Sequence, residues 1–176
     1  MIRVLVDNVY SFDARLSRKI AFYTGKRFMD SLMRNASRSG DGHLYALFAA
    51  ALLAADSGIG ARLIAAGALA FAIELLIQKA VKHLVKRERP GAMVQGVRFL
   101  VDPPDRFSFP SGHTAGAFLM ATVIASQYPL WAAPLYLWAA MVGFSRVYNG
   151  VHYPTDVLTG CALGLATAKI GLSVVM

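Results

Sequence analysis

Apolar residues gather in long runs along this chain, and short polar segments separate the runs. Five runs stand out, at residues 43–56, 61–80, 113–128, 130–146 and 155–176. Two of them are short for a lone membrane span of about 20 residues, but short or tilted spans are tolerated within a bundle. Small residues are frequent in all five, and they let membrane helices approach closely. The pattern predicts an all-α, integral-membrane helical bundle of about five transmembrane helices, without strands.

The segment 1–42 has a different pattern, in which basic and apolar residues alternate at helical spacing. Phe12, Leu16, Ile20 and Tyr23 would share one face of a helix. This spacing predicts one or two amphipathic helices at the membrane surface, an interfacial segment distinct from the transmembrane core at 43–176. A soluble cap packed on the bundle is the alternative interpretation.

Composition supports a membrane protein with an anionic partner. Of the 176 residues, 56% are hydrophobic, which exceeds the usual share in globular proteins. The net charge of +8 requires phosphate groups, lipid headgroups or nucleic acid opposite the basic residues. Because no nucleic-acid-binding module is visible, we expect membrane lipids and no nucleic acid as partners.

If all five runs cross the membrane, three polar segments meet on one face of the bundle. These are the N-terminal segment, the connection 81–112 and the turn 147–154. The connection 81–112 is long for a small domain, and such loops are usually functional or disordered. We therefore expect the chemically active residues on this face.

The first candidate segment is "KHLVKRERP", in which Lys82 and Arg89 are two helical turns apart and share a face. Pro90 disfavours helix at Arg89, so the chain can bend and return the guanidinium towards the bundle. A basic membrane flank is the simpler interpretation of this segment taken alone.

The second segment is "PSGH", residues 110–113, directly before an apolar run. Ser111 is a suitable N-cap, and the unpaired N–H groups of a helix start attract anions. Gly112 would let an anion approach the backbone, and His113 would project beside it. Simple capping explains Ser111 well but His113 poorly.

The third segment is "SRVYNGVHYPTD", which contains Arg146, His152 and Asp156. Pro154 suits the first turn of the following helix. A carboxylate four residues after a histidine can fix the imidazole tautomer and leave the other ring nitrogen free to attack. A polar turn with Asp156 matched to the helix dipole is the alternative.

Together the three segments predict a phosphoryl-transfer site. Cations and N–H groups would neutralise the phosphate oxygens. His152 would attack phosphorus, and His113 would protonate the leaving oxygen and then activate water. Because no acidic cluster could hold Mg²⁺, we expect neither a metal nor any other cofactor.

The chain resembles the type 2 phosphatidic acid phosphatase (PAP2) family, whose signature is K-x6-RP, then PSGH, then SR-x5-H-x3-D. Every fixed position and internal spacing agrees over about 75 residues, from Lys82 to Asp156. The resemblance implies a metal-independent, multi-pass lipid phosphatase of the bacterial inner membrane that works through a phosphohistidine. It implies His152 as nucleophile, His113 as acid and base, and Asp156 as the partner of His152. The implied phosphate-binding residues are Lys82, Arg89, Ser111, Gly112 and Arg146.

The resemblance leaves the substrate and two rival functions open. Polyprenyl phosphates or diphosphates, phosphorylated polyprenyl sugars, phosphatidylglycerophosphate and phosphatidate all fit. A vanadate-dependent haloperoxidase resembles the same anion pocket, although those enzymes are longer and soluble. A non-catalytic membrane protein that binds anionic lipid would need only the basic face.

Charge also predicts a topology. Of the 18 Lys and Arg residues, only Arg62 and Lys169 belong to the side away from the candidate site. The positive-inside rule therefore places the catalytic face in the cytoplasm. Many bacterial relatives are thought to act on the outer side, and members commonly have six spans, whereas residues 1–42 contain no clear span. We leave Glu74, inside an apolar run, outside the predicted site. The segment around Asp41 is interpreted first as a helix entry and second as a pocket wall, and Asp102 and Asp105 could shape the entrance.

Overall fold

The computed structural model describes residues 2–55 and 57–176, which form helices and connecting loops. The N-terminal helices are α1 (Ile2–Ala21) and α2 (Arg27–Ser39). The bundle consists of α3 (Gly42–Ala55), α4 (Ser57–Val85), α6 (Gly112–Ala125), α7 (Ala132–Tyr148) and α8 (Pro154–Val175). Two short turns, α5 (Pro90–Met93) and η1 (Pro129–Trp131), lie in the connections. No strand forms within these ranges, so the all-α prediction is confirmed.

Each of the five apolar runs contains a bundle helix, but the predicted number of membrane spans is only partly supported. Among the described helices, α4 and α8 are long and apolar enough to cross a membrane by themselves. The helices α3 and α6 are apolar but only 14 residues long. Five spans therefore stay a prediction.

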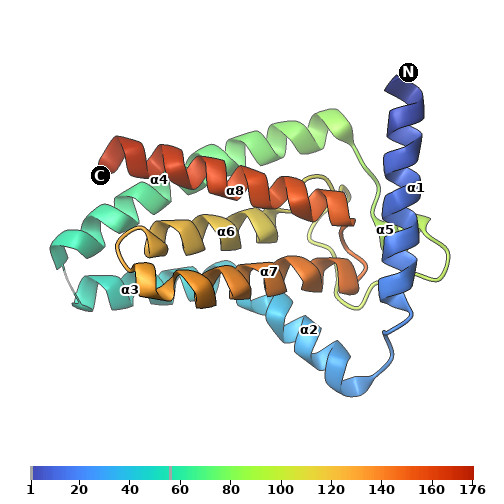
Figure 1. Ribbon diagram of the computed structural model, residues 1–176, viewed down its shortest axis with the longest axis horizontal. Helices are drawn as coiled ribbons and strands as arrows, with labels where there is room; N and C mark the ends of the chain where they lie inside the picture. Colours follow the sequence, from blue (N-terminus) through green and yellow to red (C-terminus); the bar gives the residue numbers. More distant parts are fainter. Residues whose placement is uncertain (1, 56) are drawn as a thin grey trace.

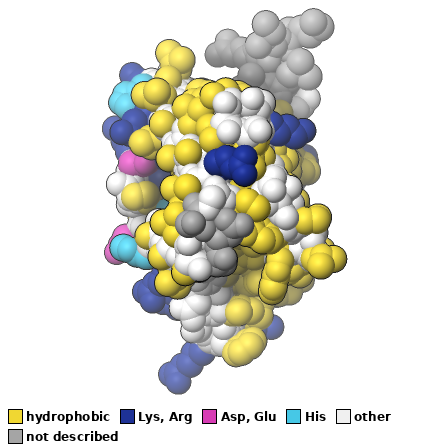
Figure 2. All heavy atoms as spheres, turned by 90° about the vertical axis from the view of Figure 1, so that its left-hand side faces the viewer, with side chains coloured by type: hydrophobic (Ala, Val, Ile, Leu, Met, Phe, Trp, Pro, Cys, Tyr) yellow, Lys and Arg dark blue, Asp and Glu magenta, His cyan; other side chains and the backbone are white. Residues whose placement is uncertain are grey.

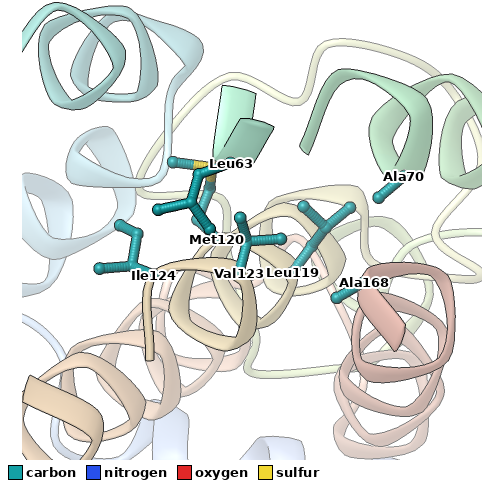
Figure 3. Packing of buried hydrophobic residues seen from close by; sticks show 7 residues of the cluster. All are labelled: Leu63, Ala70, Leu119, Met120, Val123, Ile124 and Ala168. Carbon is teal, nitrogen blue, oxygen red and sulfur yellow. The ribbon is translucent and has the colours of Figure 1, made fainter. Parts of the chain in front are cut away.

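The core of the bundle lies between α4, α6 and α8 (Figure 3). It is built from small and branched apolar side chains that are almost fully buried: Leu63, Ala70, Leu119, Met120, Val123, Ile124 and Ala168. Small residues let these helices approach closely. A Cβ at Gly164 of α8 would overlap the Ala115 carbonyl of α6, and one at Gly171 would overlap the Ala66 carbonyl of α4.

Helix α1 stands across one end of the bundle, and α2 packs along α7 (Figure 1). The buried side chains of α1 include the polar residues Asp13 and Ser17, whereas Phe12 on its predicted apolar stripe is 48% exposed. The inward contacts of α1 and α2 are thus largely polar, and several apolar side chains face outward. The two helices therefore dock on the bundle. The interfacial location of residues 1–42 stays a prediction.

The close contact of α6 with α8 gives a test of the packing. We expect Gly164→Ala to lower the free energy of unfolding by about 2 kcal/mol, because the added methyl group forces two helix backbones apart. The matched control is Gly67→Ala, whose new Cβ would have its nearest neighbour, Val123 Cγ1, at 3.9 Å. Thermal unfolding in detergent measures both variants. Equal melting temperatures for the two would contradict the packing described here.

Candidate active site

The three predicted segments do meet at one end of the bundle, where the connection 86–111 and the turn between α7 and α8 lie beside the end of α4 (Figure 1). A cavity of about 650 Å³ opens there. Its wall includes five of the eight predicted site residues, namely Lys82, Arg89, Gly112, His113 and His152. Figure 2 views the opposite end of the molecule, which is mostly hydrophobic, with charged side chains mainly at its margins.

Arg89 is the buried cation of this cavity, with only 2% of its surface exposed. Its backbone is extended and precedes Pro90, the first residue of α5, as expected before proline. The guanidinium donates to the Val151 carbonyl at 2.7 Å, and the same nitrogen lies 3.3 Å from Nε2 of His152. A fixed positive charge therefore stands beside one ring nitrogen of the predicted nucleophile.

Asp105 bridges the two cations of the first segment. Its carboxylate accepts from Lys82 Nζ at 2.6 Å and from the Arg89 guanidinium at 2.8 Å. Partial burial works to raise the pKa of Asp105, but the hydrogen bonds and charges of Lys82 and Arg89 outweigh it and lower the pKa below its usual value. Asp105 is thus held ionised within the predicted phosphate site.

His152 is buried in the turn before α8, and its backbone N–H donates to the Arg146 carbonyl at 3.2 Å. Burial lowers the pKa of the imidazole to about 3, and nearby Arg146 and Arg89 add to that effect, while Asp156 opposes it. The ring is therefore neutral at physiological pH. A neutral imidazole keeps the lone pair that a nucleophile needs.

Asp156 lies on the other side of the His152 ring, with 3.7 Å between Oδ2 and Nδ1. This distance is longer than a hydrogen bond. The carboxylate instead accepts from the Tyr153 backbone N–H at 2.8 Å and from Arg87 at 2.7 Å. Asp156 thus approaches His152 as predicted, while its hydrogen bonds go to other groups.

His113 at the start of α6 has a carboxylate partner of its own. Its Nε2 lies 2.8 Å from Oδ1 of Asp41, which comes from the connection between α2 and α3. Both residues line the cavity, and both also border a second, more polar pocket of about 410 Å³. His113 therefore lies where the two cavities meet.

Three predicted residues lie outside the main cavity wall, namely Asp156, Arg146 and Ser111. Arg146 lines the second pocket, where it donates to Ser37 Oγ of α2. Ser111 occupies the N-cap position before α6 as predicted, but its hydroxyl pairs with Thr114 Oγ1 at 2.9 Å and makes no capping bond to the backbone. Its backbone N–H donates to the Asp156 carbonyl at 3.1 Å, so the predicted capping role of the Ser111 side chain is wrong.

Gly112 lines the cavity as predicted, and its neighbour there is a side chain that the sequence did not indicate. A Cβ at this position would overlap the amide of Gln78 from α4. Glu74, one turn earlier on α4, is 4% exposed and also lines the cavity. The structure therefore places Glu74 in the wall of the site, where sequence reasoning had left it out.

Sequence reasoning also missed the buried Arg87. Its guanidinium bonds Asp156 and, at 2.6 Å, Asp13 of α1, and it lies 4.0 Å from the centre of the Tyr153 ring. Arg87 sits within the basic segment "KHLVKRERP", so only its charge was visible. Asp13 is one of four acids in the segment 1–42, and nothing in its spacing connects it with Arg87.

The chain is similar to a known protein family and to curated members of it. The family model of the PAP2 superfamily matches residues 61–176. The decaprenylphosphoryl-5-phosphoribose phosphatase of Mycobacterium tuberculosis is 38% identical over 109 residues, which cover 60% of this chain and 56% of that protein. The chain thus spans little more than half the length of this curated relative.

Two solved structures share the fold over nearly the whole chain. Aquifex aeolicus LpxE superposes with a TM-score of 0.80 and 29% identity, covering 92% of this chain and 95% of that one. The transmembrane PAP2-type phosphatidylglycerolphosphate phosphatase of Bacillus subtilis gives a TM-score of 0.78 at 24% identity, covering 95% and 86%. Because the family model covers more than half of the chain, the protein belongs to the PAP2 superfamily.

Proposed function

We propose that this protein is a membrane lipid phosphatase that transfers the terminal phosphoryl group of its substrate to His152 and then to water. One observation carries the proposal: the neutral ring of His152 presents Nε2 beside the Arg89 guanidinium, in a cavity that Lys82 and His113 also line. A nucleophile, fixed cations and a second imidazole thus surround one space. That is the set of groups a phosphoryl transfer requires.

The reaction has two steps. Nε2 of His152 attacks phosphorus, the bond from phosphorus to the lipid oxygen breaks, and His113 gives a proton to that oxygen. The products are a phosphohistidine and a lipid alcohol, or a lipid monophosphate when the substrate is a diphosphate. His113 then takes a proton from water, the resulting oxygen attacks phosphorus, and the phosphorus–nitrogen bond breaks to release inorganic phosphate.

The neighbouring residues act through position and charge. Asp156 at 3.7 Å favours the tautomer with a proton on Nδ1 and stabilises the charge that develops on His152. Asp41, at 2.8 Å, would hold and polarise His113 in the same way. Lys82, Arg89 and the backbone at Gly112 would bind phosphate oxygens, with Arg146 and Ser111 supporting them from just outside the cavity.

The fixed cations would make the reaction independent of metal. Three cationic side chains belong to the proposed set, and the described residues contain no group of three or more His, Cys, Asp or Glu side chains that could hold a metal ion. Phosphate charge would then be neutralised by Lys82, Arg89 and Arg146 in the role that Mg²⁺ fills in many phosphoryl-transfer enzymes.

A chain of cavities supports a long lipid tail on the substrate. An apolar cavity of about 160 Å³ shares Tyr45 and Phe71 with the catalytic cavity. It shares Leu52 and Ile124 in turn with a second apolar cavity of about 790 Å³. The polar end would take the phosphate head and the apolar cavities the hydrocarbon chain, as hydrophobic burial favours.

The substrate class we favour is a polyprenyl phosphate, diphosphate or phosphorylated polyprenyl sugar. The Mycobacterium tuberculosis relative is named for a decaprenylphosphoryl substrate, and the adjoining cavities suit an extended chain. Phosphatidate and phosphatidylglycerophosphate belong in the same assay panel, because their heads carry the same terminal phosphate.

Replacing the nucleophile tests the mechanism. We expect His152→Ala to lower phosphate release from lipid phosphates by about 10⁴-fold or more, because no other group can form the covalent intermediate. The purified wild type should keep its activity in EDTA. The control is His83→Ala, since His83 is exposed on α4, lies 2.8 Å from the Lys79 carbonyl and does not line the catalytic cavity.

Two outcomes would contradict the mechanism. Full activity of purified His152→Ala would end the role of His152 as nucleophile. Loss of activity in EDTA, restored by a divalent cation, would instead show that the fixed cations do not suffice.

Filling the apolar cavity tests the tail path. We expect Ala49→Phe to raise KM about tenfold for substrates of ten or eleven isoprene units, because the ring occupies space proposed for the tail. A substrate of one or two units should be turned over as by the wild type. Ala46→Phe is the control, because Ala46 is exposed on the same helix and lines none of the three connected cavities. Equal losses for short and long substrates would rule out this tail path.

We also propose that the catalytic end faces the cytoplasm, on the basis of the charge asymmetry between the two ends. The C-terminal end of α8 then lies on the opposite side, as Figure 1 shows for the two ends of the bundle. A reporter enzyme that works only in the periplasm should be active when it is fused after Met176. A fusion that reports from the cytoplasm would reverse the orientation.

A further inference from the structure

Asp105 occupies the space between two cations that the proposed function assigns to phosphate. Its two carboxylate oxygens accept separately, one from Lys82 at 2.6 Å and the other from Arg89 at 2.8 Å. The backbone carbonyl of Asp105 also accepts from Nε of Arg89 at 2.9 Å. These are the kinds of contact that two oxygens of a phosphate group would make with the same side chains.

The partners of this contact differ in how firmly they are held. Arg89 is 2% exposed and is fixed by the Val151 carbonyl, whereas the Asp105 side chain is 45% exposed. An arriving anion would therefore displace the carboxylate into water and leave the guanidinium in place. The lowered pKa of Asp105 means that the displaced group is a charged competitor at neutral pH.

We propose that Asp105 is an internal competitor at the phosphate site: its carboxylate holds Lys82 and Arg89 until a dianionic terminal phosphate displaces it, and it lowers the occupancy of the site by the phosphodiester headgroups of bulk lipid. This inference rests on the proposed function. A terminal phosphate carries about −1.5 to −2 charges at pH 7, whereas a phosphodiester carries a single charge, as Asp105 does.

The competition works through occupancy. An internal competitor raises the apparent Kd of every anion by the same factor, because only the open fraction of the site can bind. A dianion gains more attraction from Lys82 and Arg89 than a monoanion does, so it still binds within a useful range. The phosphodiester, which a bilayer presents in great excess, loses the affinity that it would need to block the site.

Removing the charge while keeping the shape tests this role. Asp105→Asn retains the backbone contact with Arg89 and removes the negative charge. We expect it to bind inorganic phosphate about tenfold more tightly by calorimetry, since charge-assisted bonds to Lys82 and Arg89 no longer compete. In the variant, phosphate release from a lipid phosphate in nanodiscs should become sensitive to added phosphatidylglycerol, whereas we expect the wild type to be insensitive to it.

The matched control is Asp102→Asn, which removes the same charge from the same loop, three residues away, at a side chain on the wall of the second pocket. It should behave as the wild type in both measurements. If Asp105→Asn and Asp105→Ser bind phosphate no more tightly than the wild type, or fail to fold, Asp105 only positions Lys82 and Arg89. Phosphate binding needs no turnover, so a wild type that releases no phosphate would overturn the proposed function without deciding this comparison.

Discussion

The guanidinium of Arg87 is buried between two carboxylates, Asp13 of α1 at 2.6 Å and Asp156 of α8 at 2.7 Å. Burial alone works to lower the pKa of Arg87, but the two acids outweigh it and raise the pKa above its usual value. Removing one partner of such a buried pair leaves an uncompensated charge and typically costs about 3–5 kcal/mol. This one cation therefore ties the N-terminal helix, the connection after α4 and the start of α8 into a single arrangement.

That arrangement determines how His152 is presented. Asp156 shares its charge between Arg87 and the Tyr153 backbone, which leaves it 3.7 Å from the imidazole. On the other side of the ring, Arg89 is fixed by the Val151 carbonyl one residue before His152. The histidine thus lies between an anion and a cation that are each anchored by other groups. Its neutral state follows from burial and from the nearby arginines, which together outweigh the single carboxylate.

The sequence predicted the residues whose spacing is local and missed those whose partners are distant. Lys82 and Arg89, and likewise His152 and Asp156, are close in sequence, so both pairs could be found from their spacing. The shared helical face predicted for Lys82 and Arg89 is wrong, because α4 ends at Val85 and the backbone of Arg89 is extended before Pro90. Arg87 and Asp13 are separated by 74 positions, and His113 and Asp41 by 72, and no periodicity links such pairs. The helices followed from apolar runs for the same reason. The capping bond expected of Ser111 is missing although its partner is local, because the hydroxyl pairs with the Thr114 hydroxyl three residues along the chain and makes no bond to the backbone.

One face of α4 lines both the apolar cavity proposed for the lipid tail and the catalytic cavity proposed for the phosphate head. The residues Ile64, Gly67 and Phe71 line the apolar cavity, and Gln78 and Lys82 line the catalytic one. These positions recur every three to four residues or in multiples of that interval, so they form a single stripe along the helix. The stripe changes from apolar to polar along its length, as a lipid phosphate does from tail to head. Helix α4 extends beyond the apolar run at 61–80 to Val85, and this extension carries Lys82 out to the polar end of the stripe. The length of one helix therefore sets the distance between the anion-binding group and the hydrocarbon path.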